Sequence, residues 1–172
     1  MTLEGARVTL RLPQPGDVAR VFAACQDPAI QHWVPIPVPY ERKHAEWWVD
    51  TAAEQWRTAA ELRFVVAGKD GDLIGAMGLH AREAGMRELG YWTAPPARRA
   101  GLTAEAARLL CEWAFDELKL RRIEWLAAVG NVGSLRVAEK TGFVLEGTMR
   151  ARLEHRREVR DAWVAGLLPS DQ

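Results

Sequence analysis

The sequence has few cysteines and no excess charge of either sign. Of its 172 residues only Cys25 and Cys111 are cysteines, far apart and each in a stretch typical of a helix. We therefore expect reduced core thiols rather than a disulfide. Lys plus Arg number 23, and so do Asp plus Glu, so no overall field attracts the molecule to nucleic acid or to an anionic membrane. We expect neither as a partner, and a polyanionic ligand would need a local site.

Long apolar runs are also absent from the sequence. No window approaches about 18 uninterrupted apolar residues, and residues 1–12 lack a basic segment followed by an apolar one. A soluble, cytoplasmic protein is the expectation. Because 48% of the residues are hydrophobic, the chain can bury a sizeable core, and its length is typical of one domain. We predict a single domain over residues 1–172.

Several enzyme motifs are missing as well. The sequence contains no Cys or His cluster with metal-ligand spacing, no Gly-x-x-x-x-Gly-Lys-Ser/Thr loop and no Gly-x-Ser-x-Gly elbow. We therefore expect no metal, no nucleotide hydrolysis and no serine hydrolase chemistry.

The hydrophobic pattern predicts a mixed α/β (α+β) fold. Alternating or apolar runs between turn residues favour strands over 8–12, 62–68, 73–80, 88–93, 123–129, 143–153 and 159–168. Helical spacing or composition indicates helices over 16–26, 41–57, 103–118 and 131–141. Gly142 lies where a left-handed helix C-cap belongs, and the proline-rich segment 33–39 is predicted to be an ordered loop.

The most informative stretch lies between a predicted strand and the start of a long helix. It consists of Arg98, Arg99, Ala100, Gly101, Leu102 and Thr103. The first turn of a helix has unpaired N–H groups and the positive end of the helix dipole, and small residues before it let a phosphate approach the backbone. Taken alone, a turn with one glycine is weak evidence, and an ordinary connection is the alternative.

A second set of residues follows in the order typical of one enzyme family. It comprises Asn131, Ser134, 135–140, Gly142, Phe143, Glu146, Gly147 and Arg150, with Asp161 near the start of the last strand. Together with the 98–103 loop, this order resembles the GNAT superfamily of acetyltransferases and, more narrowly, its RimJ/RimL-like branch. The resemblance covers essentially the whole chain. It implies a mostly antiparallel sheet of about seven strands, splayed between the fourth and fifth and flanked by helices.

Two loop positions depart from the family pattern, which is usually Arg-Gly-x-Gly-x-Ala. Arg99 stands at the first glycine position, and Thr103 stands where Gly or Ala is common. If the backbone at Arg99 needs no positive φ, the side chain can point to solvent or to a phosphate oxygen. If the position demands glycine, we expect weak binding of the cofactor.

The resemblance implies direct transfer of an acetyl group from acetyl-CoA to a primary amine, either a protein N-terminus or a small molecule. It implies that the backbone of Tyr91, Trp92 and Thr93 contacts the pantetheine arm, that the 98–103 loop holds the pyrophosphate, and that Asn131 hydrogen-bonds the cofactor. By the same resemblance, Ser134 protonates the leaving thiolate. Many other family members use a tyrosine for this step, and none is present near Lys140.

The reaction also needs a base and a wall for the acceptor. Glu88, on the strand before the loop, is the best carboxylate candidate, and the alternative is a solvated or ion-paired glutamate. His80 is a second candidate on the acceptor side, or else a strand-end surface residue. Trp33 and Trp47 lie in the segment that forms the acceptor wall in relatives. Core packing is the alternative for these tryptophans and for Trp48 and Trp56.

Other functions stay open from the sequence. The two loop substitutions and the missing tyrosine also fit a non-catalytic acyl-CoA-binding module. A larger donor such as succinyl-CoA would require a cationic side chain at the inner end of the cleft, and the sequence does not identify one. Dimers are frequent in the resembling family, so exposed tryptophans could serve a homodimer interface instead of a pocket.

Overall fold

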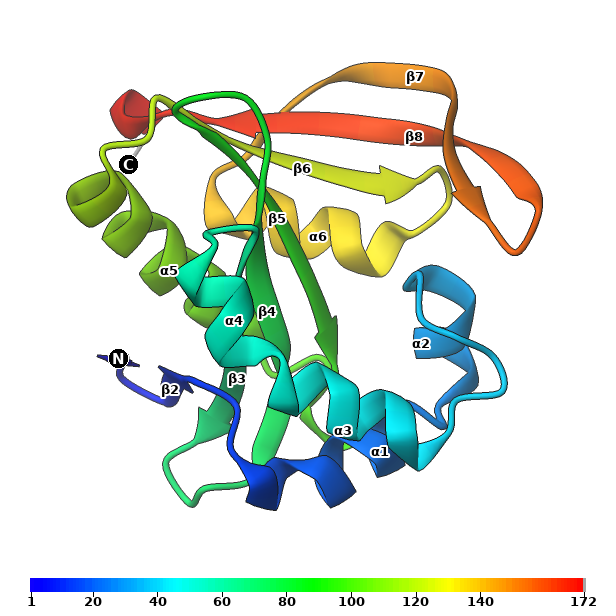
Figure 1. Cartoon of the computed structure of the whole chain (residues 1–172). Coiled ribbons are helices and arrows are strands. Elements are labelled where there is room, and N and C mark those ends of the chain that lie inside the picture. Colours follow the sequence, from blue (N-terminus) through cyan, green and yellow to red (C-terminus); the bar gives the residue numbers. More distant parts are fainter. Residues whose placement is uncertain (172) are drawn as a thin grey trace.

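The computed structural model describes residues 1–171, arranged as one mixed sheet with helices packed against it (Figure 1). The sheet has eight strands in the order β1-β2-β3-β4-β5-β6-β8-β7. The strands are β1 (Thr2–Glu4), β2 (Val8–Arg11), β3 (Glu61–Gly68), β4 (Leu73–Ala81), β5 (Met86–Thr93), β6 (Arg122–Ala128), β7 (Val144–His155) and β8 (Glu158–Leu167). Neighbouring strands are antiparallel except β5 and β6.

The predicted α/β fold with a mostly antiparallel sheet is confirmed, but the count of about seven strands is one short. The additional strand is β1, which has only three residues and pairs with β2. So short a segment carries no readable alternation of apolar and polar residues. The last residue of the predicted domain, Gln172, lies outside the described residues.

The helices follow the predicted spans with two differences. The α-helices are α1 (Val18–Ala24), α2 (Pro28–Trp33), α3 (Arg42–Asp50), α4 (Ala52–Arg57), α5 (Leu102–Leu118) and α6 (Val132–Thr141); short 3₁₀ turns cover η1 (Pro15–Asp17), η2 (Pro95–Ala97) and η3 (Pro169–Asp171). The first difference is that the single helix predicted over 41–57 is broken at Thr51, whose hydroxyl donates to the Trp47 carbonyl oxygen at 2.7 Å.

The second difference is α2, a helix that the sequence reading did not predict. The helix predicted over 16–26 stops directly before Asp27 and Pro28, a pair that can also close a helix. In the structure they begin the next one, because the Asp27 carboxylate accepts from the Ile30 N–H at 3.0 Å and Pro28 takes the first helical position. Both are favourable helix starts. Gly142 has φ 105° at the C-terminus of α6, which confirms the predicted left-handed cap.

The core forms two clusters. The larger one lies between the sheet and α5 and includes Phe64, Leu110 and Trp125. The smaller one joins α1, α2 and α3. Cys25 and Cys111 are both free and buried, as expected for core thiols. No helix among residues 1–171 is long and apolar enough to cross a membrane.

The predicted splay of the sheet is confirmed between β5 and β6. These strands pair only over Met86↔Arg122, Arg87↔Ile123 and Glu88↔Glu124. Beyond Glu88, β5 continues beside β4 alone, while β6 follows β8. Figure 1 shows β5 and β6 running apart, with α2 on the open side. The fold therefore opens a gap in the sheet directly before the 98–103 loop.

Candidate active site

A cleft of about 990 Å³ occupies the region where β5 and β6 separate. Residues of α2 and α3 line one part of it, residues of β3, β4 and β5 its floor, and the starts of α5 and α6 the other part. Its size matches the upper range of ligand pockets, about 300–1,000 Å³. Of the predicted site residues, those that line the cleft are Trp33, Trp47, His80, Glu88, Tyr91, Trp92, Thr93, Arg98, Arg99, Gly101, Thr103, Asn131 and Ser134.

Two predicted loop residues do not line the cleft. The Ala100 carbonyl oxygen accepts a hydrogen bond from Arg7 Nη1 at 3.1 Å. Leu102 begins α5 and packs against the large core cluster. These two residues anchor the loop through contacts outside the cleft.

The backbone of the 98–103 loop has two left-handed residues. Gly101, the N-cap of α5, has φ 76°, which glycine adopts without strain. Arg99 has φ 66°, so the alternative in which Arg99 needs no positive φ is wrong. For a residue with a Cβ, the left-handed conformation costs roughly 1–2 kcal/mol. The strain at Arg99 therefore lowers the stability of the fold in this conformation.

Thr103, the other departure from the family pattern, is accommodated by a partner. Its hydroxyl is buried and lies 2.7 Å from the Thr93 hydroxyl. The extra bulk therefore ties the first turn of α5 to the end of β5 and leaves the helix start facing the cleft. A helix start of this kind, opened by a glycine, fits the pyrophosphate of coenzyme A.

Arg98 links the 98–103 loop to the start of α2. Its Nη2 donates to Asp27 Oδ1 at 2.5 Å, and its Nε donates to the Thr93 carbonyl oxygen at 3.3 Å. The hydrogen bond from Arg98 lowers the pKa of the Asp27 carboxyl below its usual value. Because Asp27 caps α2, this ion pair connects the cofactor loop with α2.

The start of α6 lies opposite this loop. Asn131 is the N-cap, and its Oδ1 accepts from the Ser134 N–H at 3.2 Å. Ser134 Oγ accepts from Trp125 Nε1 at 3.2 Å and donates to the Tyr91 hydroxyl oxygen at 3.0 Å. The Tyr91 hydroxyl in turn donates to the Ser134 carbonyl oxygen at 2.9 Å. The sequence reading gave Tyr91 only a backbone role and missed these side-chain contacts.

The end of β5 offers a free strand edge to the cleft. Tyr91, Trp92 and Thr93 pair with Met77, Ala76 and Gly75 of β4, respectively. The opposite edge faces the gap from which β6 has diverged. An extended ligand with amide groups can form strand-like hydrogen bonds along such an edge.

Three titratable side chains stand in a row on the floor of the cleft. Glu61, His80 and Glu88 lie directly opposite one another across β3, β4 and β5. Glu88 is ion-paired with Arg82, whose Nε donates to it at 3.0 Å. His80 Nε2 lies 3.9 Å from Glu61 Oε1. The sequence reading missed Glu61, because only the strand register brings it beside His80.

A buried arginine, Arg63, joins Glu61 of this row to the tryptophans of α3. Arg63 donates to Glu61 at 2.8 Å and to the Trp48 carbonyl oxygen at 2.7 Å. Its guanidinium carbon lies 5.1 Å from the Trp47 ring centroid and 5.5 Å from that of Trp48, within the range of cation–π contacts. Trp47 is 58% exposed, so it is available for a ligand. By contrast, Trp56 packs against Phe64, as the core alternative predicted.

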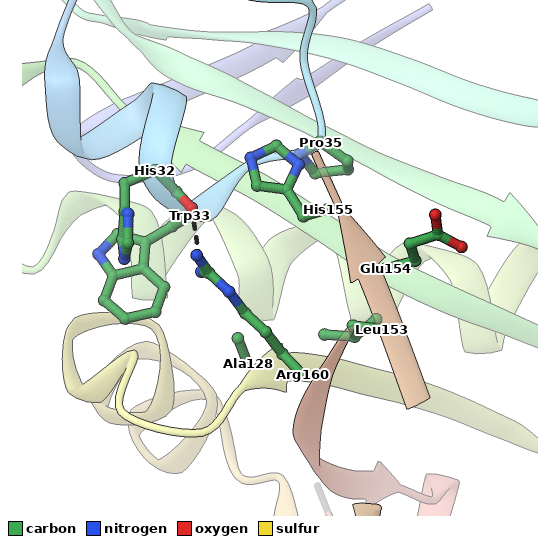
Figure 2. Close-up of a pocket in the computed structure, with 8 residues that line it drawn as sticks. All are labelled: His32, Trp33, Pro35, Ala128, Leu153, Glu154, His155 and Arg160. Atoms are coloured by element: carbon green, nitrogen blue, oxygen red, sulfur yellow. Dashed lines mark hydrogen bonds between the residues drawn. The ribbon is translucent and has the colours of Figure 1, made fainter. Parts of the chain in front are cut away.

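Side chains of the β7–β8 hairpin hold the C-terminus of α2. His155 Nε2 lies 3.1 Å from the Gln31 carbonyl oxygen, which Arg156 also contacts, and Arg160 Nη1 donates to the His32 carbonyl oxygen at 3.5 Å. Figure 2 shows Arg160 and His155 beside His32 and Trp33, around a small cavity of about 60 Å³. Cationic groups are favourable at a helix C-terminus. The hairpin thus supports α2, which carries Trp33.

In the part of the chain that the structure describes, no group of three or more His, Cys, Asp or Glu side chains is placed to hold a metal ion.

Comparison with known proteins identifies the relatives of this chain. A family model described as an acetyltransferase (GNAT) domain matches residues 7–144. The Bacillus subtilis (strain 168) protein named "Putative ribosomal N-acetyltransferase YdaF" is 33% identical over 150 residues, which are 83% of this chain and 81% of that protein. A GCN5-related N-acetyltransferase from Brucella melitensis has 28% identity and a TM-score of 0.84, with 99% of this chain and 80% of that chain covered. The fold is also that of Mycobacterium smegmatis RimJ in complex with CoA-disulfide, with a TM-score of 0.88 at 23% identity over 99% of this chain and 88% of that one.

Proposed function

Since the chain belongs to the GNAT acetyltransferase family and uses acetyl-CoA as its acetyl donor, we propose that its acceptor is the α-amine of a protein N-terminus. The observation that carries this proposal is the shape of the cleft. One continuous cavity of about 990 Å³ joins the helix starts of α5 and α6 to an open aromatic wall with the exposed Trp47. The relative named as a ribosomal N-acetyltransferase supports an acceptor of this class.

We assign the donor to the side of the cleft formed by β5, α5 and α6. The free edge of Tyr91, Trp92 and Thr93 would take the pantetheine amides, and the loop before α5 would take the pyrophosphate. Asn131 would contact the donor from the α6 side while it caps that helix. Acetyl-CoA supplies the thioester carbonyl on which the amine acts.

The acceptor amine would approach over the row of Glu61, His80 and Glu88. Arg63 and Arg82 balance the charges of Glu61 and Glu88, so we expect the amine to enter this row in its neutral form. The α-amine has a reference pKa of about 8, so a fair fraction is neutral near neutral pH, and a base acting through a water is sufficient. Glu88 is the proposed base, with His80 on the acceptor side, and Ser134 is the proposed proton donor to the sulfur.

The acceptor class can be tested with three matched substrates. The first is a short peptide with a free N-terminus and no lysine. The second is the same peptide with a blocked N-terminus and one lysine, and the third is a set of small primary amines. With acetyl-CoA as donor, we expect thiol release and one added acetyl group on the first peptide by mass spectrometry. Preferential acetylation of lysine or of small amines would contradict the proposal.

The donor is tested separately. We expect thiol release from acetyl-CoA but not from succinyl-CoA.

We also propose a cytoplasmic location and self-association through β7. Ribosomal proteins, the acceptor class suggested by the relative's name, are made in the cytoplasm. β7 is an edge strand of the sheet and carries the exposed apolar residues Val144, Leu145 and Met149. Such an edge favours pairing with another copy. Light scattering on the purified protein would give a dimer mass, and a monomer at all concentrations would contradict this part.

A further inference from the structure

The tyrosine that is missing near Lys140 has a counterpart on a different element. The sequence contains two tyrosines, Tyr40 and Tyr91. Tyr40 belongs to the small cluster of α1, α2 and α3. Tyr91, on β5, reaches across the splay to the first turn of α6 and contacts Ser134 through two hydrogen bonds. A phenol therefore lies next to the hydroxyl group that is proposed to protonate the leaving sulfur.

The groups around Ser134 form a short chain of hydrogen bonds. Trp125 Nε1 donates to Ser134 Oγ at 3.2 Å, and this indole belongs to a side chain that is 1% exposed. Ser134 Oγ is 3.0 Å from the Tyr91 hydroxyl oxygen, and the same hydroxyl is 2.9 Å from the Ser134 carbonyl oxygen. A rotation of two hydroxyl hydrogens, with no movement of heavy atoms, lets Tyr91 donate to Ser134 Oγ while Ser134 donates into the cleft.

We propose that Tyr91 is a positioning residue that resupplies the proton which Ser134 delivers to the leaving sulfur. The inference rests on the role of Ser134 in the proposed function. As the amine nitrogen bonds to the carbonyl carbon and the carbon–sulfur bond breaks, the sulfur takes the Ser134 Oγ proton. Ser134 Oγ takes the phenolic proton of Tyr91 in the same step. Glu88 takes the proton that the amine loses, and the return of this proton through water to Tyr91 restores both groups.

The acidities of the groups favour this relay over serine acting alone. An alcohol is a much weaker acid than a thiol, so a lone serine would be left as an unfavourable alkoxide. A phenol is a stronger acid than an alcohol, since its reference pKa of about 10 lies nearer to that of a thiol, about 8.5, although burial raises the pKa of Tyr91 above that reference. The hydrogen bond from Trp125 stabilises the serine oxygen while its proton is exchanged.

The surroundings of Tyr91 keep the phenol protonated. Burial raises the pKa of Tyr91, although the hydrogen bonds with Ser134 and Trp125 lower it in part. The other titratable group acting on Tyr91 is the fully buried Cys111 thiol of α5, whose pKa burial also raises. A phenol held neutral in this way has its proton available over the whole working pH range.

Three variants test the relay, namely Tyr91→Phe, Ser134→Ala and the double variant. We expect Tyr91→Phe to lower kcat about 10²-fold, within the range for general acid catalysis, with acetyl-CoA affinity changed less than about threefold. Because the two groups act as one unit, the double variant should lose little more than Ser134→Ala. The solvent isotope effect on kcat should indicate two transferred protons in the wild type and one in Tyr91→Phe.

Two results would overturn the relay. One is full kcat in Tyr91→Phe when Ser134→Ala is inactive, which would leave the role of Ser134 and the acetyl transfer intact. The other is a double variant whose loss of kcat equals the product of the losses in the two single variants. If Tyr91→Phe unfolds, 3-fluorotyrosine in a Tyr40→Phe background places a more acidic phenol at position 91 alone. The relay predicts a changed kcat at a fixed pH for this protein relative to unlabelled Tyr40→Phe, and an unchanged kcat would contradict it.

Discussion

The two walls of the cleft are built in different ways. The donor wall, formed by Thr93, the 98–103 loop, Asn131 and Ser134, consists of the ends of secondary-structure elements, and its side chains mostly fix the backbone: Thr93 with Thr103, Asn131 with the Ser134 N–H. The acceptor wall, formed by Trp33, Trp47, Glu61, His80 and Glu88, consists of side chains from five different elements. In the proposed function, donor recognition depends on local backbone geometry, whereas acceptor choice depends on side chains that can change independently of the fold.

The largest effect is expected on the acceptor wall. Glu88→Gln keeps the shape of the side chain but removes the proton acceptor, so we expect kcat/KM to fall about 10²-fold or more. The affinity for acetyl-CoA, measured by calorimetry, should stay within about threefold, because Glu88 belongs to the other wall.

His80→Gln is the matched control for this prediction. His80 lies directly opposite Glu88 and beside Glu61, so it is the competing base. If His80→Gln loses more kcat/KM than Glu88→Gln, the assignment of the base to Glu88 is wrong. A drop in acetyl-CoA affinity in either variant would show that the two walls are not separate.

A second test addresses the ion pair that joins the walls. Arg98→Ala should weaken the binding of coenzyme A about tenfold or more, since a hydrogen bond to a charged group contributes about 1.5–3 kcal/mol. Asp27→Asn should instead strengthen the binding of coenzyme A, because it releases Arg98 for the pyrophosphate. Asparagine still caps α2. Titration calorimetry of both variants provides the comparison. Weaker binding in Asp27→Asn would mean that the ion pair helps to hold the loop in its binding conformation.

The smallest effect concerns the strained loop residue. Arg99→Ala removes the charge but keeps a Cβ at φ 66°, whereas Arg99→Gly removes both. We expect Arg99→Gly to exceed Arg99→Ala in free energy of unfolding by about 1 kcal/mol, the lower end of the left-handed penalty. Both should bind coenzyme A equally well. Tighter binding by Arg99→Gly in calorimetry would show that the ligand, and not the free fold, requires the left-handed backbone.

Much of the donor wall could be predicted from the sequence because its signals are local. A strand that stops at two prolines, a glycine before a helix, and Asn131 three residues before Ser134 all act within a few positions. The loop before α5 and the splay were predicted for this reason. The backbone of Arg99 could not be decided, since the family's glycine at this position allows positive φ while arginine itself gives no sign of it.

The acceptor wall could be predicted only in part, because register and packing decide it. Glu61 becomes a neighbour of His80 only through the pairing of β3 with β4. The contact of Tyr91 with Ser134 spans 43 residues and depends on the angle between β5 and β6. The helix α2 was missed for a different reason, because Asp27 and Pro28 can end one helix or start another.

The central claim is that the starts of α5 and α6 form the donor site, and calorimetric titration with coenzyme A tests it most directly. We predict saturable binding with one site per chain. In Asn131→Ala the binding should be weaker by several-fold, and loss of the α6 cap should lower the free energy of unfolding by about 1 kcal/mol. Absence of binding to the wild type, or unchanged binding in folded Asn131→Ala, would contradict the assignment of this wall to the donor.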